Sequence, residues 1–415
     1  MSNLNYLEKL LDRVQVEWKP LSDVLVRTKG TKITASQMKE LHKNGAPVKI
    51  FAGGRTVAFV NYEDIPAKDI NKQPSIIVKS RGVIEFEYYE EPFSHKNEMW
   101  SYYSNKDEIS IKYIYHFLKL NEPHFQNVGG KMQMPQIAIP DTDKFPVPVP
   151  CPDNPEKSLK IQVEIVRILD AFTAMTAELT AELTAELSLR KKQYNYYRDQ
   201  LLSFKEGDVE WKTLGDIGDF TYGYAAKAQE AGDARFVRIT DINTNGKLSP
   251  TAQMYIDISG ENEKYILKKN DLLMARTGAT FGKTMIFQED YPAIYAGFLI
   301  KLSLAPNIVN PKYYWHFAQS DLFWDQANKL VSGGGQPQFN ANALKQVKLP
   351  VPHPADPAKS LAKQDRIVTI LDKFDTLTSS ITEGLPREIE LHQKQYEYYR
   401  DLLLSFPKPD AEVAA

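Results

Sequence analysis

The chain carries one long segment twice, and this duplication limits the possible folds more than any other feature. Residues 148–172 and 350–374 are identical at 15 of 25 positions, and residues 192–204 and 394–406 at 11 of 13. Both pairs are separated by 202 residues, so about 57 residues are repeated without a gap. A sharp repeat of this size indicates that one structural unit occurs twice.

A shorter repeat marks the start of each half, VEWKPLSDV at 16–24 and VEWKTLGDI at 209–217. The segments between the repeats, residues 22–147 and 215–349, show no convincing alignment with each other. Gene duplication with decay of one half would have blurred the repeats as well, but they remain sharp. We therefore favour two variable domains that do the same task on different targets.

The repeated segments are predicted to be long helices. Residues 156–206 contain neither glycine nor proline, and their apolar side chains recur three and four positions apart, as at Ile161 and Ile165. A helix of this length spans about 70 Å and needs a partner to cover its apolar stripe. The second copy, residues 360–406, is the expected partner, and Gly384-Leu385-Pro386 should break it into two helices or bend it.

The predicted fold class is α+β. Two α/β domains are separated by two long helical regions, which pack as an antiparallel coiled coil with pseudo-twofold symmetry. The expected segments are an N-terminal part of the helical region (1–21), the first variable domain (22–147), a central helical region (148–214), the second variable domain (215–349) and a C-terminal helical region (350–415).

The central helical region contains the tetrapeptide TAEL three times in tandem, at residues 176–187. Alanine, glutamate and leucine all favour helix. Leu179, Leu183 and Leu187 fall on one side of such a helix, so a packed leucine seam is the simplest interpretation. Each tetrapeptide also lengthens a helix by about 6 Å, so the copy number can set a spacing.

An aromatic and basic block ends each repeat. Its members are Tyr194, Tyr196, Tyr197 and Arg198 in the first copy, and Tyr396, Tyr398, Tyr399 and Arg400 in the second. Such residues suit a protein interface, a DNA-backbone face, or the cover of a helical seam, and the block alone does not decide between them. Its duplication favours an interface slightly, because two equal sites would bind two copies of one partner.

The composition sets outer limits on the function. A net charge of −2 counts mildly against a protein that binds DNA by itself, although partner subunits can supply positive charge. The single cysteine, Cys151, fits a reducing compartment. Neither a signal peptide nor an apolar run of about 18 residues is found, so a soluble cytoplasmic protein that does not enter a membrane is expected.

Four segments together resemble the specificity subunits of type I restriction-modification systems, in particular the type IC group. They are PVPCPDNPEKS with QVEIVRILD, the TAEL tandem, RKKQYNYYRDQLLSFKEG, and ITEGLPREIE with KQYEYYRDLLLSF. The resemblance covers the repeated regions closely and the layout of the whole chain. Within the second variable segment, FVRITDI at 236–242 and DLLMARTGATFGK at 271–283 are also similar to recognition domains of this family.

The resemblance implies a non-catalytic subunit in which each variable domain reads one half of a bipartite site in double-stranded DNA. It also implies that the helices set the spacer and bind two modification subunits, with restriction subunits docking on that methyltransferase core. No cofactor is expected on this chain, because S-adenosylmethionine, ATP and Mg would be used by the partner subunits.

The candidate DNA-binding residues combine suitable chemistry with an expected place in loops or at strand ends, and many of them stand near glycines. Phosphates attract lysine, arginine and hydroxyl groups, while base edges are read by arginine and by amides at exposed tips. The candidates are Arg55, Thr56, Lys79, Arg81, Lys96, Asn97, Arg238, Thr240, Arg276, Thr277, Lys283, Gln336 and Gln338.

Two other classes of protein remain as alternatives. A coiled-coil scaffold that presents two protein-binding domains would not be retained on DNA even with its partners. A self-sufficient methyltransferase would need a cofactor loop, an adenine-binding motif or a metal cluster, and the sequence predicts none of these.

Overall fold

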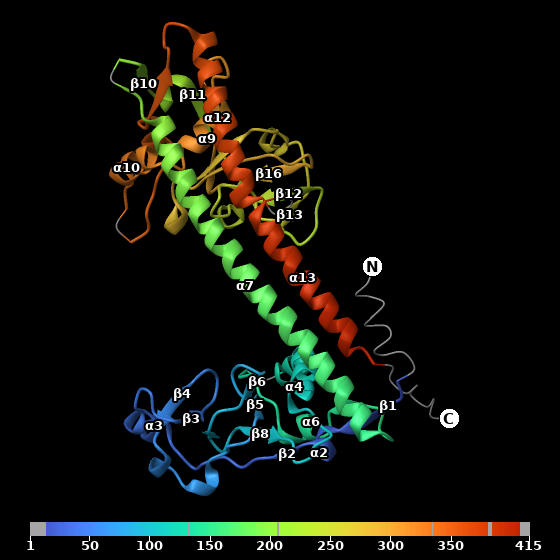
Figure 1. The fold of residues 1–415 in the computed structure, drawn as a ribbon. Coiled ribbons are helices and arrows are strands. Elements are labelled where there is room, and N and C mark those ends of the chain that lie inside the picture. The colour runs from blue at the N-terminus through green and yellow to red at the C-terminus, as the bar shows by residue number, and fades with distance from the viewer. Residues whose placement is uncertain (1–13, 132, 206, 334, 381–383, 407–415) are drawn as a thin grey trace. The chain divides into compact units, whose positions relative to one another are not determined.

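The computed structural model describes residues 14–131, 133–205, 207–333, 335–380 and 384–406. It divides into two compact units, each with its own variable domain (Figure 1). Unit 1 comprises Met1–Thr180 and Leu391–Ala415, and unit 2 comprises Ala181–Glu390. Each unit therefore also holds segments of both helical regions. No helix among the described residues combines the length and the apolar character needed to cross a bilayer.

The first variable domain is built on two small sheets. One sheet has the strand order β2-β8-β5-β6, and the other has the order β4-β3-β7, in which β3 and β7 run parallel. The strands are β2 (Val26–Arg27), β3 (Val48–Phe51), β4 (Val57–Val60), β5 (Ser75–Lys79), β6 (Glu85–Tyr89), β7 (Phe93–His95) and β8 (Trp100–Tyr103). The helices are α2 (Leu21–Val24), α3 (Ala35–Leu41), α4 (Ile111–Leu120), α5 (Glu122–Gly129) and α6 (Ile139–Asp143).

The second variable domain has the same topology, although its sequence could not be aligned with that of the first. Its sheets have the orders β11-β17-β14-β15 and β13-β12-β16, with β12 and β16 parallel. The strands are β11 (Gly218–Tyr222), β12 (Ala234–Val237), β13 (Tyr255–Ile256), β14 (Leu272–Ala275), β15 (Thr284–Ile286), β16 (Ala293–Tyr295) and β17 (Leu299–Leu304). The helices are α8 (Leu214–Ile217), α9 (Pro311–Phe317), α10 (Asp321–Leu330) and α11 (Ala341–Lys345).

A two-stranded antiparallel ribbon closes each domain. In unit 1, β1 (Val16–Pro20) pairs with β9 (Pro146–Pro150). In unit 2, β10 (Val209–Thr213) pairs with β18 (Lys348–Pro352). The assignment of residues 1–21 to a helical region is therefore wrong for β1, while residues 1–13 lie outside the described part of the chain. The pairing explains why the VEWK repeat and the proline-rich repeat occur together.

The repeated segments form the long helices that the sequence predicts. Helix α7 (Pro155–Leu202) is 48 residues long and contributes to both units. Its partner is broken into α12 (Pro357–Ser379) and α13 (Leu385–Leu404), with a left-handed Gly384, which confirms the predicted break. The helices run antiparallel within each unit.

Equivalent aromatic pairs mark the contact between these helices. In unit 1, Phe172 stacks on Tyr399 with 5.1 Å between ring centroids. In unit 2, Phe374 stacks on Tyr197 at 5.5 Å. Phe374 and Tyr399 lie 202 positions after Phe172 and Tyr197, which is the offset of the repeats. The repeat symmetry is therefore present in the packing as well as in the sequence.

The apolar stripe of each long helix is covered by a variable domain as well as by a helix. In unit 1, Ile165 and Leu169 share a core with Phe117 of α4 and with Leu403 of α13. In unit 2, Ile367 and Leu371 share a core with Phe317 of α9. Burial of these large side chains holds each domain firmly to its helix, because each buried side chain contributes roughly 1.5–3 kcal/mol to stability.

A glutamine at the same position of each repeat joins each domain to its helix through the backbone. The Gln162 side chain accepts a hydrogen bond from Ser110 N–H at 2.9 Å and donates one to the Glu108 carbonyl at 3.0 Å. Gln364 accepts from Asn310 N–H at 2.9 Å and donates to the Ile308 carbonyl at 2.8 Å. The same polar attachment is therefore used twice.

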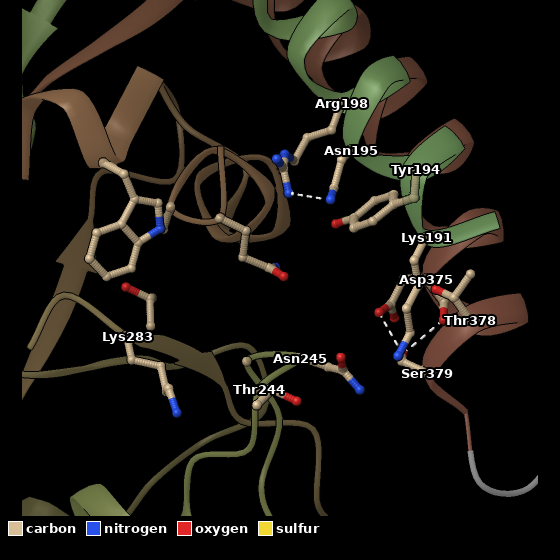
Figure 2. Close-up of a pocket in the computed structure, with 15 residues that line it drawn as sticks. Lys191, Tyr194, Asn195, Arg198, Thr244, Asn245, Lys283, Asp375, Thr378 and Ser379 are labelled. Atoms are coloured by element: carbon tan, nitrogen blue, oxygen red, sulfur yellow. Dashed lines mark hydrogen bonds between the residues drawn. The ribbon is translucent and has the colours of Figure 1, made fainter. Parts of the chain in front are cut away.

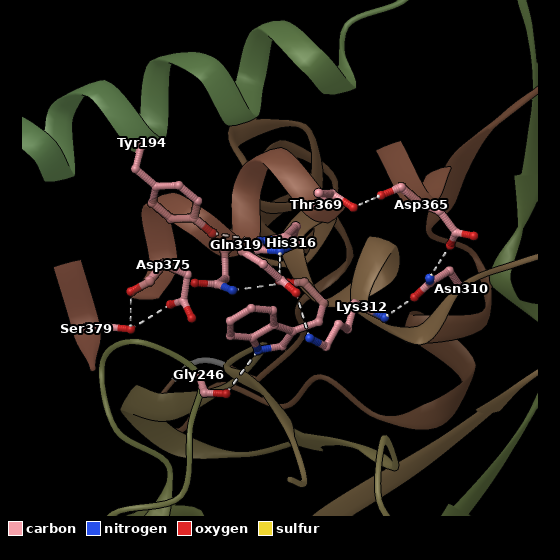
Figure 3. A network of polar contacts seen from close by, with 12 residues as sticks. Tyr194, Gly246, Asn310, Lys312, His316, Gln319, Asp365, Thr369, Asp375 and Ser379 are labelled. Carbon is pink, nitrogen blue, oxygen red and sulfur yellow. Dashed lines mark hydrogen bonds and ion pairs between the residues drawn. The ribbon is translucent and has the colours of Figure 1, made fainter. Parts of the chain in front are cut away.

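A buried histidine and a lysine complete each attachment by sharing one helix carboxylate. In unit 2, the Asp372 oxygens lie 2.9 Å from His316 Nε2 and 2.6 Å from Lys312 Nζ. In unit 1, Asp170 meets His116 and Lys112 at 3.0 and 2.6 Å. Figure 3 shows the network of unit 2.

Burial sets the charge of these groups. It lowers the pKa of His316 below its ordinary value, although Asp372 opposes this shift, so the imidazole is neutral at pH 7. Burial alone would raise the pKa of Asp372, but hydrogen bonds from His316 and Lys312 hold it below its ordinary value. A neutral His316 donates from Nε2 to Asp372 and accepts at Nδ1 from the Tyr194 hydroxyl, 2.9 Å away.

Candidate nucleic-acid interface

The two variable domains share an arrangement of loops at the end of a central strand of their larger sheet, β5 in the first domain and β14 in the second. In the first domain, Gly82 N–H donates to the Pro135 carbonyl and Ile137 N–H donates to the Ser80 carbonyl. In the second domain, Gly278 N–H donates to Pro337 and Phe339 N–H to Arg276. The loop after the central strand is therefore held against a Pro-Gln segment in both domains. We call this arrangement the loop cradle (residues 80–82 with 135–137, and 276–278 with 337–339).

Glycine is required at the turn of each loop cradle. Gly82 has φ of 82° and Gly278 has φ of 71°, a left-handed conformation that residues with a side chain adopt only under strain. Neither glycine has a close obstacle around the position of a Cβ atom, so the backbone angle, and not space, selects glycine. The ARTGA and KSRGV stretches are thus equivalent turns.

The first domain brings most of its candidates together around a cleft of about 670 Å³. Thr56, Arg81 and Lys96 line it, and the neighbouring Arg55 and Asn97 are exposed to solvent. The loop at Gly54 reaches the Arg81 loop directly, because Gly54 N–H donates to the Arg81 carbonyl at 3.0 Å. Lys96 is partly neutralised by Glu98, which lies 2.7 Å away.

Lys79 is the one candidate of the first domain that the structure removes from this surface. Its side chain is buried, and its ammonium group lies 2.6 Å from Glu85 and 2.8 Å from Glu87 on β6. These carboxylates raise the pKa of Lys79 against the opposing effect of burial. Because this ammonium is buried and already paired with two carboxylates, it is not available to a phosphate at the surface, so the prediction of Lys79 as a DNA contact is wrong.

The second domain gathers Arg276, Thr277 and Gln338 in its loop cradle. Thr277 is buried, and its hydroxyl accepts a hydrogen bond from the Gln338 amide at 2.9 Å. That bond positions the loop and makes Thr277 a structural residue instead of a direct contact. Gln336 is exposed on the same segment.

The other candidates of this domain lie elsewhere. Arg238 is paired through two nitrogens with Asp241, and this pairing raises its pKa, while Thr240 beside it is exposed. Lys283 lines a cleft of about 310 Å³ in unit 2, together with Lys191 and Arg198 of α7 (Figure 2). This cleft therefore carries three basic side chains from the domain and its helix.

The sequence interpretation missed one residue in the first loop cradle. Gln136 lies 202 positions before Gln338, and it pairs with Arg81 as Gln338 pairs with Thr277. The signal was present, because the dipeptide Pro-Gln stands at the same offset as the repeats. It was obscured because it lies in the segments that otherwise do not align.

The aromatic block at the end of each repeat is only partly available to a partner. Tyr194 is buried at 8% exposure and its hydroxyl contacts His316 of the second domain, while Arg198 is buried at 6% exposure with its guanidinium bound to Asn195 and Asp199 of its own helix. Their assignment to a subunit interface is therefore wrong. Tyr197 is 41% exposed, and Tyr196 and Tyr398 are the most exposed tyrosines of the block, at 62% and 57%. Tyr396, Tyr399 and Arg400 are partly buried.

The TAEL leucines have an intermediate burial. Leu179, Leu183 and Leu187 all lie within α7 and are neither core nor fully exposed residues. This is what a seam covered by a single neighbouring helix would give. The described residues contain no group of three or more His, Cys, Asp or Glu side chains able to hold a metal ion.

Comparison with known proteins identifies the family. The model of the type I restriction modification DNA specificity domain matches residues 14–189 and again residues 206–391. The chain belongs to the type I restriction-modification specificity family. Each matched segment contains one variable domain and the start of the long helical segment that follows it.

Specificity subunits of type I restriction enzymes match this chain over most of its length. The type I restriction enzyme EcoR124I/EcoR124II specificity subunit of Escherichia coli is 39% identical over 424 residues, covering 99% of both chains. The EcoprrI specificity subunit of Escherichia coli is 35% identical, covering 92% of this chain and 93% of that one.

Solved structures show the same fold at low sequence identity. The S subunit of a type I restriction-modification system from M. genitalium has a TM-score of 0.50 at 16% identity, covering 96% of this chain and 98% of the other. A chain from a structural study of type I system assembly and conformational transition has a TM-score of 0.61 at 11% identity, covering 94% and 97%.

Proposed function

We propose that this chain is the DNA-recognition subunit of a type I restriction-modification complex, with each variable domain reading one half of a bipartite site in double-stranded DNA. The observation that supports this most directly is the loop cradle, which occurs in both domains and carries different side chains in each. A shared framework with different exposed residues is what two readers of different sequences need. The chain itself is non-catalytic.

The partners are part of the same proposal. Two modification subunits bind the helical regions, and restriction subunits dock on that methyltransferase core. S-adenosylmethionine, ATP and Mg are used by those partners, and the complex acts in the cytoplasm. Tyr196 and Tyr398 support this arrangement, because they are equivalent in the two repeats and similarly exposed. The TAEL tandem supports assignment to the type IC group.

Native mass spectrometry tests the stoichiometry. We expect one chain with two modification subunits, and we expect the double variant Tyr196→Ala, Tyr398→Ala to lose both. The matched control is Tyr194→Phe, which alters a tyrosine buried inside unit 2 and should keep both subunits. A stable one-to-one complex of the unaltered chain would contradict the proposed symmetry.

The number of TAEL copies is proposed to set the spacer between the half-sites. Residues 176–187 lie within α7, where one tetrapeptide adds about 6 Å and rotates the rest of the helix by about 40°. A base pair rises about 3.4 Å along the duplex, so one copy corresponds to one or two base pairs. With three copies, the family resemblance implies a spacer of about seven base pairs.

Sequencing of methylated adenines tests both parts of the function. The reconstituted complex should methylate a bipartite motif, and deletion of residues 180–183 should shorten its spacer while both half-sites stay the same. An unchanged spacer would reduce the tandem to a packing seam. A chain that forms the complex but is not retained on DNA would instead support the alternative, a protein-interaction scaffold.

A further inference from the structure

One arginine of the second loop cradle is clamped between two aromatic rings. The Arg276 guanidinium carbon lies 5.2 Å from the centroid of the Tyr222 ring and 5.4 Å from that of Phe298. Backbone contacts fix the clamp, because Arg276 N–H donates to the Phe298 carbonyl at 3.1 Å and its Nε donates to the Gly297 carbonyl at 3.2 Å. The side chain is therefore held in one orientation before any ligand binds.

The clamp uses only one of the three guanidinium nitrogens. Among the described residues, the two terminal amino groups of Arg276 have neither an acid nor a carbonyl as a hydrogen-bond partner. Arg238, in the same domain, differs because Asp241 occupies its Nε and one of its amino groups. Arg276 thus offers a rigid pair of donors, which is the geometry that binds two acceptors side by side.

The surroundings of this donor pair favour a base edge over a phosphate. Phe298 is 56% exposed and Tyr222 is 44% exposed, so large apolar ring faces flank the guanidinium. A hydrated phosphate gains little from such faces, whereas the edges and methyl groups of bases pack well against them. Arginine donors matched to two adjacent acceptors select guanine, which presents O6 and N7 in the major groove.

The same positions in the first domain carry other chemistry. The cradle carbonyl of Arg276 corresponds to that of Ser80, since Phe339 and Ile137 bind them equivalently. Ser80 is buried and its hydroxyl donates to the carbonyl of Glu98, the residue that stands where the second domain has Phe298. The side chain at this position therefore differs in size, charge and exposure between the two domains. Such a difference is required of a residue that determines sequence specificity.

We propose that Arg276 reads a guanine of the second half-site from the major groove, with Tyr222 and Phe298 as positioning residues. This inference rests on the proposed function, because it names the base that the second domain selects. It requires that the half-site contain at least one G·C pair at a position where no other base is accepted.

Base analogues test the inference in the complex with its modification subunits. After the methylated motif has been mapped, each guanine of the second half-site is replaced by 7-deazaguanine, which lacks N7, or by inosine, which lacks only the minor-groove amino group. We expect one 7-deazaguanine position to reduce the methylation rate at least about fivefold, while inosine at that position has little effect. Arg276→Ala should lower the rate on unmodified DNA by about five- to 150-fold and remove the sensitivity to 7-deazaguanine.

A conservative variant separates base reading from phosphate binding. Arg276→Lys keeps the charge but loses the planar donor pair and the Nε bond to the Gly297 carbonyl, so it should weaken the guanine preference, although less than Arg276→Ala does. Unchanged reading of the first half-site shows that each variant is folded and assembled. If Arg276→Ala keeps the same 7-deazaguanine sensitivity, if Arg276→Lys retains full guanine preference, or if the half-site lacks an invariant G·C pair, the inference is wrong although the proposed function stands. If the unaltered complex methylates no bipartite motif, the proposed function itself fails.

Discussion

The two variable domains are attached to their helices by the same core and the same polar pairs, and the second attachment has further polar contacts between domain and helix. In unit 2, the Tyr194 hydroxyl binds Nδ1 of His316, and Lys247 from a domain loop binds both Asp375 and Ser379 of α12. In unit 1, the residue equivalent to Asp375 is Thr173. Its hydroxyl donates to the Leu169 carbonyl at 2.7 Å and lies 3.3 Å from the Tyr396 hydroxyl, so both contacts stay within the helical pair.

This difference separates the contacts that the repeat must preserve from those that each domain can add. The glutamine, histidine and carboxylate positions recur because both domains dock through them. The reinforcing contacts depend on a domain loop, so they vary with the domain. We therefore expect the second domain to open from its helix less often than the first.

Domain exchange gives the largest expected effect. Replacing residues 22–147 by the matching segment of a relative should change one half of the methylated motif completely and leave the other half unchanged. The reason is that each variable domain lies within its own compact unit of the chain. Sequencing of methylated sites measures the outcome, and a change in both halves would show that the domains do not read independently.

The buried tyrosine should matter only in unit 2. Tyr194→Phe leaves the His316 Nδ1 acceptor buried without a partner, which costs about 1–3 kcal/mol in local stability. Tyr396→Phe removes only a long contact between the Tyr396 and Thr173 hydroxyls, so its cost should be near zero. Hydrogen exchange of the α9 and α4 amides in the assembled complex measures both. Equal acceleration in the two variants would abolish the distinction between the units.

Removal of Lys247 should have a smaller effect. Lys247→Ala leaves Asp375 with Ser379 as a hydrogen-bond partner, so the loss should be about 1 kcal/mol. The control is Lys269→Ala, because the Lys269–Asp290 pair is highly exposed and should contribute under about 0.5 kcal/mol. Faster exchange around residues 243–249 is expected for Lys247→Ala alone, and no change there would mean that the pair does not fasten the domain.

The response to pH should differ least between the units. Burial lowers the pKa of both His116 and His316, so the folded state binds fewer protons than the unfolded state. Both attachments should be fully stable above the unfolded value of about 6.5 and weaken as pH falls below it. The lowered pKa of Asp372 acts in another window, below about pH 4. Amide hydrogen exchange in α4 and α9, corrected for the intrinsic rate, should become faster in both helices between pH 7 and pH 5. An unchanged exchange rate would contradict neutral histidines.

Much of the architecture could be predicted from the duplication. The long helices, their antiparallel pairing and the break near Gly384 are consequences of the repeat offset, the apolar spacing and one glycine–proline pair. The common fold of the variable domains could not be predicted, because equivalent strands such as β5 and β14 share few residues. Their similarity lies in backbone hydrogen bonds that many sequences satisfy.

The candidate interface was predicted less well than the fold. Glycines beside basic residues correctly drew attention to both loop cradles. Lys79 failed because its carboxylate partners come from the next strand, and Tyr194 failed because a domain distant in sequence covers it. Such tertiary pairings leave no local pattern in the sequence.

The ribbons β1–β9 and β10–β18 bring the entry and the exit of each variable domain side by side. Each variable domain is therefore an insertion whose two ends are neighbouring strands. Replacing it leaves the course of the rest of the chain unchanged. Genetic recombination at the coding sequence for these ribbons would join new and old segments at the same pair of strands. One recombination event would thus exchange a whole variable domain, while both long helical regions are inherited intact.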